Sequence, residues 1–219
     1  HDVAGNTHSR VTTTDWGNAA GALNTNGRFP VKATAEIDLS TSLVTTHEFD
    51  TRTGAKTRTV DANGYVTEWA YDTLGRKLEE TRLAGSTAET KTQWTRGLCA
   101  DLQPGDPAAC TGVPAVIFTK TVSTKDGVAY TPRTYAVGDV LGRTVRRIKE
   151  AHEERLDPQT SQEVSTFVYV DTTYDAFGQV VATTRPYFVG ASSTLSTTIQ
   201  FDEAGRPRIT IAPNGLETD

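Results

Sequence analysis

Methionine is absent from this 219-residue sequence, and cysteine, histidine and leucine are scarce. Without methionine, and with His1 as its first residue, the chain is expected to be an internal segment of a longer protein. Sparse leucine and absent methionine remove two of the stronger helix formers and so disfavour a helical fold. The remaining histidines, His8, His47 and His152, show no metal-ligand spacing with His1 or each other, which argues against a metal centre.

Long apolar runs and concentrations of positive charge are missing as well. The best apolar run, residues 113–118, contains a proline and is far shorter than a membrane-spanning helix. The net charge is −5 with both signs mixed along the chain, which excludes the basic stripe that nucleic-acid binding requires. No signal peptide, phosphate-binding loop or nucleophile elbow is present. We therefore expect no nucleic-acid partner, no membrane insertion, no metal, no cofactor and no enzymatic activity.

Threonine dominates what is present, with 38 residues. It is β-branched and polar, which suits the solvent-facing positions of a strand better than a helix. Residues 65–71 alternate as a strand would, with Tyr65, Trp69 and Tyr71 on one face. Residues 145–156 carry charges at helical spacing, but a strand followed by a loop is favoured because the segment leaves a turn motif. Composition and pattern therefore predict an all-β fold.

A short motif recurs along the chain: an aromatic residue, Asp, any residue, an apolar residue, Gly, and then Arg or a polar substitute. The Asp side chain can accept hydrogen bonds from nearby backbone amides, and Gly permits positive φ. Each copy therefore predicts a hairpin with a type I turn and a bulge. The aromatic residue is expected to anchor the incoming strand, and the apolar residue to fold back onto the same surface. The residues assigned to these turns are Tyr71, Asp72, Gly75, Arg76, Asp139, Gly142, Arg143, Tyr174, Asp175, Gly178, Phe201, Asp202, Gly205 and Arg206.

Several copies of the motif are incomplete. Partial copies occupy residues 50–54 and 61–64, and a faint copy occupies residues 2–6. Asp139 follows Gly138 instead of an aromatic residue, and Gln179 stands where other copies have Arg. We expect distorted turns at these two positions.

The two cysteines, Cys99 and Cys110, flank a segment that contains two prolines and a glycine and is expected to be a loop. A disulfide that closes this loop is one interpretation, and it would stabilise the protein by about 2–3 kcal/mol. Two unbridged thiols are the alternative. Two thiols without a nearby histidine are too few for a structural zinc site.

The turn motifs and their spacing resemble the YD, or RHS, repeats of bacterial RHS proteins and of the B and C components of Tc insecticidal toxin complexes. Vertebrate teneurins carry the same repeat type. The resemblance is clearest over residues 169–215, with YDAFGQ and FDEAGR in tandem, and covers residues 47–83 and 130–219. It implies antiparallel hairpins that form a curved or spiralling sheet, as a fragment of a larger β-shell. The expected division is an irregular leading segment at 1–46, repeat hairpins at 47–83, an insertion at 84–129 and tandem repeats at 130–219.

The resemblance also implies a function, namely a wall segment of a secreted or cell-surface bacterial shell that encloses a toxic polypeptide. Its partners would be the rest of the same polypeptide or other toxin-complex subunits. The alternative is a repeat module that binds carbohydrate or a cell surface, with Trp16, Trp69 and Trp94 as candidate stacking residues. RHS shells often end in a self-cleaving Asp-Pro motif, but Asp157 and Pro158 match only its first half and are interpreted as an ordinary turn.

Overall fold

The computed structural model describes residues 11–17, 25–36, 41–156, 163–191 and 194–218. Within these ranges the only helical element is a single 3-10 turn, η1 (Cys99–Asp101), and the paired strands are antiparallel. The predicted all-β antiparallel fold is therefore confirmed. No helix in the described ranges is long and apolar enough to cross a membrane. The chain divides into two compact units, residues 1–93 with 123–128, and residues 94–122 with 129–219.

The first unit is a meander in which each strand pairs with the next along the chain. The interpretation of residues 1–46 as irregular is wrong for three stretches that form strands, because their backbones pair: residues 12–15 with residues 32–35, and residues 32–36 with residues 42–46. The strands of this unit are β1 (Thr12–Asp15), β2 (Lys32–Glu36), β3 (Ser42–Phe49), β4 (Lys56–Val60), β5 (Val66–Tyr71), β6 (Lys77–Arg82) and the start of β7 (Thr90–Leu98).

The first unit is held together more by its strand ladder than by a core. Among its described residues, Val31 is the only buried large apolar side chain. Polar side chains pair across the strands instead: Arg58 on β4 lies between Glu48 and Glu68, with donor–acceptor distances of 3.1 and 3.2 Å. Directly opposed charges of opposite sign stabilise a sheet without a hydrophobic layer. Both faces of this unit therefore remain largely polar.

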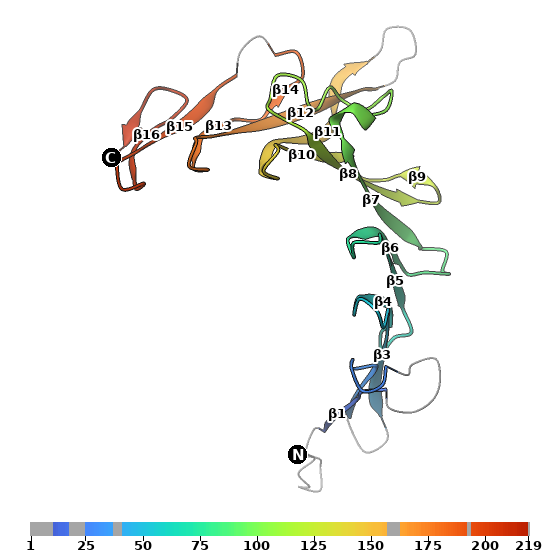
Figure 1. Ribbon diagram of the computed structural model, residues 1–219. Helices are drawn as coiled ribbons and strands as arrows, with labels where there is room; N and C mark the ends of the chain where they lie inside the picture. The colour runs from blue at the N-terminus through green and yellow to red at the C-terminus, as the bar shows by residue number, and fades with distance from the viewer. Residues whose placement is uncertain (1–10, 18–24, 37–40, 157–162, 192–193, 219) are drawn as a thin grey trace, which may run out of the picture. The chain divides into compact units, whose positions relative to one another are not determined.

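The second unit continues the hairpin pattern, with pairing in the order β8, β10, β11, β12, β13, β15, β16 and β17. Residues 145–156 are strand throughout, so the favoured strand is confirmed, whereas the loop expected at its end and the helical interpretation are wrong. The strands that lie wholly in this unit are β10 (Thr134–Gly138), β11 (Thr144–Leu156), β12 (Glu163–Tyr174), β13 (Val180–Thr184), β14 (Tyr187–Phe188), β15 (Ser196–Phe201), β16 (Pro207–Ile211) and β17 (Glu217–Thr218) (Figure 1). The short β14 also pairs with β12. The division between the units falls within β7, β8 (Ile117–Lys125) and β9 (Val128–Ala129).

The main hydrophobic core of the described residues lies in the second unit, beneath the loop that contains both cysteines. Tyr135, Ile148 and Tyr169 are neighbours across β10, β11 and β12 and are each at most 4% exposed. Ala109 and Cys110 of the loop pack onto these side chains. Part of the predicted insertion at 84–129 is therefore a cover for one face of the sheet.

Candidate functional site

The recurring turns share one hydrogen-bonding pattern. In the turn at Asp72, the Oδ1 atom accepts the backbone amides of Leu74 and Arg76 at 2.9 and 2.8 Å, and Gly75 adopts a φ of 77°. The Arg76 guanidinium returns to the Oδ2 atom at 2.7 Å. The same set of contacts holds the turns at Asp139 and Asp202. One aspartate thus satisfies two turn amides and orients the arginine that follows.

The two turns that were expected to be distorted are not. Asp139 and Asp175 each accept the same two backbone amides, at 2.8–3.0 Å. Gly138 is tolerated before Asp139 because the side chain of Ile117 occupies that space, 3.0 Å from where a Cβ atom would lie. Gln179 keeps the backbone contact and loses only the ion pair, since its amide turns to the carbonyl of Gly205 at 2.8 Å. The motif therefore depends on Asp and Gly more than on its flanking residues.

Adjacent turns on the same edge of the sheet are joined by the aromatic residue of the motif. The hydroxyl of Tyr71 donates to the carbonyl of Lys56, and that of Tyr174 donates to the carbonyl of Thr144, at 2.8 and 3.0 Å. Each acceptor belongs to the strand that leaves the preceding turn. The Arg143 guanidinium also lies 4.6 Å from the centre of the Tyr174 ring. The tyrosine therefore connects its own turn to the previous one.

The corner at residues 50–54, identified in the sequence as a partial copy, also has the aromatic position of the motif. Phe49 directly precedes Asp50 and supplies the aromatic position, and it stacks on Phe29 with ring centroids 5.0 Å apart. Asp50 accepts the amide of Arg52 at 2.9 Å, but an additional residue separates it from Gly54. The Phe-Asp pair in the sequence was the signal that could have assigned Phe49 to this partial copy.

The apolar residue within the turn does not fold back onto the sheet, contrary to expectation. Leu74, Leu141 and Phe177 are 75%, 72% and 91% exposed. Their backbone amides are hydrogen-bonded to the turn aspartates, so these residues are fixed at the tip of the hairpin, away from the strands. Each such turn therefore presents a large apolar side chain to solvent.

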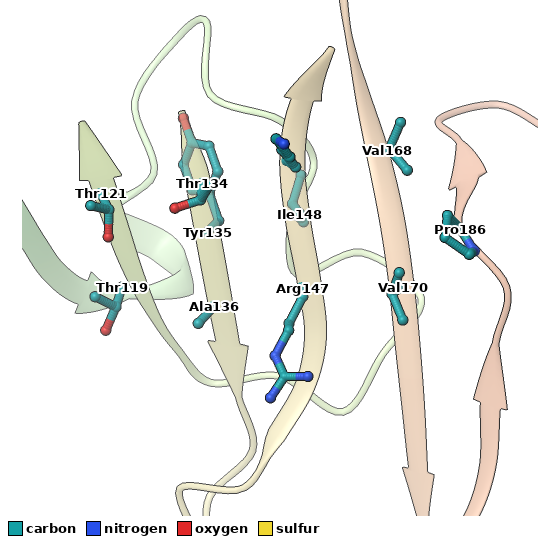
Figure 2. A pocket seen from close by; sticks show the side chains of 11 residues that line it. Thr119, Thr121, Thr134, Tyr135, Ala136, Arg147, Ile148, Val168, Val170 and Pro186 are labelled. Atoms are coloured by element: carbon teal, nitrogen blue, oxygen red, sulfur yellow. The ribbon is translucent and has the colours of Figure 1, made fainter. Parts of the chain in front are cut away.

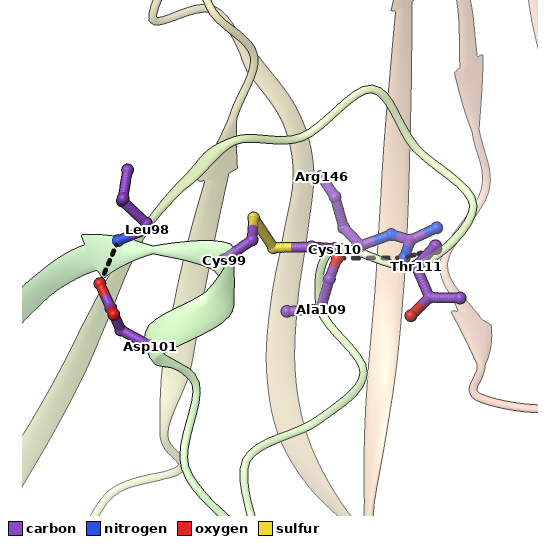
Figure 3. Close-up of a disulfide and its surroundings, with 7 residues drawn as sticks. All are labelled: Leu98, Cys99, Asp101, Ala109, Cys110, Thr111 and Arg146. Atoms are coloured by element: carbon purple, nitrogen blue, oxygen red, sulfur yellow. Dashed lines mark hydrogen bonds between the residues drawn. A yellow bond between two sulfur atoms is a disulfide. The ribbon is translucent and has the colours of Figure 1, made fainter.

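Cys99 and Cys110 form a disulfide, and a buried arginine fixes the loop that it closes (Figure 3). Arg146 of β11 donates to the loop carbonyls of Ala109 and Thr111 at 3.1 and 2.8 Å. Its other nitrogens form a bidentate pair with Asp171 at 2.6 and 2.7 Å. Bidentate pairs of this kind combine charge with fixed geometry. The loop is therefore held by a covalent bond and by a buried cation.

A second polar cluster fixes the other part of the same loop. Asp106 accepts hydrogen bonds from the Tyr135 hydroxyl at 2.7 Å and from the ammonium of Lys120. Burial raises the pKa of Asp106, but the hydrogen bonds from Lys120 and Tyr135 outweigh it and lower the pKa below its usual value. Burial, together with the neighbouring carboxylate, raises the pKa of Tyr135. The cluster therefore keeps Asp106 ionised and Tyr135 neutral at physiological pH.

The opposite face of the second unit is open and forms a shallow groove of about 440 Å³ (Figure 2). Ala136, Val168 and Val170 contribute apolar side chains, and Arg147 and Lys149 stand beside them. No ion pair joins either cation to a carboxylate in the part of the chain that the structure describes. The two faces thus differ, one covered by the loop and one exposed.

The tryptophans proposed for sugar stacking are not alike in their surroundings. Trp69 donates its indole hydrogen to Glu80 at 2.9 Å, and the ammonium of Lys77 lies 5.5 Å from its ring centre. Trp16 is 48% exposed, beside β1, and Trp94 is half-buried in the second unit. Within the described ranges, no group of three or more His, Cys, Asp or Glu side chains could hold a metal ion. The faint turn at 2–6 and the Asp157–Pro158 pair lie outside the described residues.

The hairpins are thus joined through their corners, and the sheet of the second unit is open on one face. The fold is similar to that of TcdB2-TccC3. The crystal structure of TcdB2-TccC3-TEV matches 94% of this chain with a TM-score of 0.63 at 14% identity. TcdB2-TccC3 itself matches with the same score and coverage at 15% identity.

The form of TcdB2-TccC3 without its hypervariable C-terminal region matches with a TM-score of 0.61 at 14% identity. The chain spans only 12–14% of the length of these proteins. No family model and no curated protein matches the sequence. At such low identity, the similarity concerns the fold.

Proposed function

We propose that the chain is a wall segment of an exported, toxin-complex-like β-shell built from YD/RHS repeats, and that the shell encloses a polypeptide. The observation that carries the proposal is the series of Asp–Gly corners joined to one another by Tyr71 and Tyr174. Such a series can be extended by adding hairpins, which is what a long wall requires. The similarity of fold to TcdB2-TccC3 over nearly the whole chain supports the same role.

The proposed role is mechanical and involves no catalytic step. The first unit presents polar cross-strand pairs on its strands, which suits a sheet with solvent on both sides. The second unit has one face strengthened by a disulfide-closed cover. The partners would be the rest of the same polypeptide or other subunits of a toxin complex.

Protease protection tests the proposed enclosure. In a polypeptide that contains this chain together with a C-terminal cargo segment, the cargo should resist added protease. Deletion of residues 194–218, which removes β15, β16 and β17, should open the wall and make the cargo cleavable. A matched control inserts a flexible Gly-Ser segment after Gly127, in the exposed turn before β9, and should leave protection intact. Equal cleavage of the cargo in the intact and deleted forms would refute enclosure.

Sedimentation velocity tests whether the wall continues beyond this chain. In the described residues β17 pairs with β16 only, so one side of it is an open edge, and open edges associate with other strands. The apparent mass should rise with concentration. It should fall in Glu217→Pro, because the Glu217 amide points to the open side whereas Thr218 pairs with Thr210 of β16. A single mass at every concentration for both forms would count against a continuing sheet.

A further inference from the structure

An open pocket of about 710 Å³ lies at two neighbouring corners of the second unit. It lies between the turn that begins at Asp175 and the turn that begins at Asp202. Phe177 and Phe201 provide aromatic surface, and Val181 and Ile199 provide aliphatic surface. Three acidic residues, Asp175, Asp202 and Glu203, also line the pocket.

The same chain shows how the equivalent place is occupied one repeat earlier. The β11–β12 register pairs Arg146 with Asp171, so three residues further Arg143 lies opposite Tyr174. There the Arg143 guanidinium covers the Tyr174 ring at 4.6 Å. A guanidinium over an aromatic face is favourable, more so when a carboxylate holds it in place, as Asp139 does here.

The β13–β15 register reproduces this relation with one substitution. Ala182 pairs with Thr198, so the same shift of three residues places Gln179 opposite Phe201. Gln179 has no charge, and its amide is engaged with the Gly205 carbonyl instead. The Phe201 ring therefore lacks the cation that covers the Tyr174 ring, and the pocket lies at this position.

The carboxylate of this corner lacks a cation too. Asp72, Asp139 and Asp202 each form an ion pair with the arginine four residues later. Asp175 accepts only backbone amides, and in the described part of the chain neither it nor Glu203 forms an ion pair. The corner with Gln179 in place of arginine therefore has an aromatic ring, aliphatic side chains and two carboxylates without an ion pair.

We propose that this pocket binds the guanidinium of an arginine side chain presented by another polypeptide segment. The guanidinium would cover Phe201 and pair with Asp175, as Arg143 does with Tyr174 and Asp139 within the chain. The aliphatic stem would lie along Val181 and Ile199, and Phe177 would close over it. The pocket prefers arginine to lysine because a planar guanidinium stacks on rings and pairs with carboxylates at once. The inference goes beyond the proposed shell and does not depend on it.

Titration of the 219-residue chain, monitored by NMR of the aromatic side chains, tests the pocket. The probe is N-acetyl-arginine amide, compared with the lysine and citrulline analogues. We expect saturable shifts of the Phe177 and Phe201 signals in the millimolar range for arginine, weaker binding for lysine and no saturation for citrulline. Equal binding of citrulline, which keeps the shape and loses the charge, would overturn the proposal, as would the absence of saturation with arginine.

Variants separate filling of the pocket from damage to the fold. Gln179→Arg should supply the missing cation internally and abolish binding, whereas Gln179→Ala leaves the pocket empty and should retain it. Phe177→Ala should weaken binding about two- to fivefold, because it removes the apolar surface that covers the arginine stem. Leu74→Ala, at the same position of another corner, is the matched control and should change nothing. Binding that survives Gln179→Arg, or that Leu74→Ala weakens as much as Phe177→Ala, would place the ligand elsewhere.

Discussion

Replacement of Asp171 by Ala tests whether the buried ion pair holds the disulfide-closed loop on the sheet. The Arg146 side chain is 6% exposed and would lose both carboxylate acceptors while remaining charged beneath the loop. Removal of one partner from a buried pair costs about 3–5 kcal/mol. Because Asp171 itself is 19% exposed, we expect a loss near the lower end, about 3 kcal/mol.

A double variant separates the charge from the packing. Arg146→Met with Asp171→Leu replaces the pair by apolar side chains, so no buried charge remains. The carbonyls of Ala109 and Thr111 lose their donors, but Thr111 is exposed, so only the Ala109 carbonyl stays buried without a partner, at about 1–3 kcal/mol. The double variant should therefore recover part of the loss caused by Asp171→Ala and not all of it.

Urea unfolding, monitored by hydrogen exchange of peptides from residues 99–116 and 166–174, measures the loss of stability of the single and the double variant in the second unit. Arg58→Met is the matched control, because Arg58 also forms ion pairs across neighbouring strands but is 36% exposed. Its loss should cost about 1 kcal/mol or less. The reasoning would be refuted if Asp171→Ala and Arg58→Met cost the same, or if exchange in residues 99–116 did not change.

Three further predictions follow from individual contacts. Burial raises the pKa of Glu80, but hydrogen bonds from Arg82, Trp69 and Lys77 outweigh it and lower the pKa to about 2. The stability that Glu80 contributes is therefore present above about pH 4.5 and is lost as the pH falls towards 2. Acid unfolding of the first unit, monitored by Trp69 fluorescence, should become less steep over this range in Glu80→Gln. Asp202→Ala should increase amide exchange at Ala204 and Arg206, whereas Asp202→Asn, which keeps an acceptor oxygen, should change it little. Equal increases in both variants would show that the ion pair, which both remove, matters more than the turn amides. Reduction of the disulfide should destabilise the second unit by about 2–3 kcal/mol without altering exchange in residues 42–82, and an equal change in both units would contradict a local role for the loop.

The strand content and the corners could be predicted because their causes are local. A type I turn with a bulge needs Asp and Gly at fixed spacing, and the sequence shows both directly. The loop over the second unit could not be predicted in the same way. Its position depends on Arg146 of β11, whose acceptors lie 35 and 37 residues earlier. A basic residue in the segment Val-Arg-Arg-Ile gives no indication that one arginine is buried and the next exposed.

The aromatic anchors illustrate the same limit on a smaller scale. Tyr71 and Trp69 share a face of β5, and a common role as core residues was the natural expectation. Tyr71 instead donates to a backbone carbonyl across the sheet, and Trp69 donates to a carboxylate. The hydrogen-bond partner of each side chain depends on the neighbouring strand, and the motif does not determine the register of that strand.

The bulge at each corner has a consequence for assembly. The strand register shifts by one residue beside the aromatic position at Phe49, Tyr71, Tyr174 and Phe201, and each shift is set by the turn that follows. Each turn therefore sets the strand register of its own hairpin, independently of the hairpin before it. A slip in one hairpin would be confined there, so a sheet of this kind can become long without accumulating alignment errors, and loops of very different length can be accepted between its repeats.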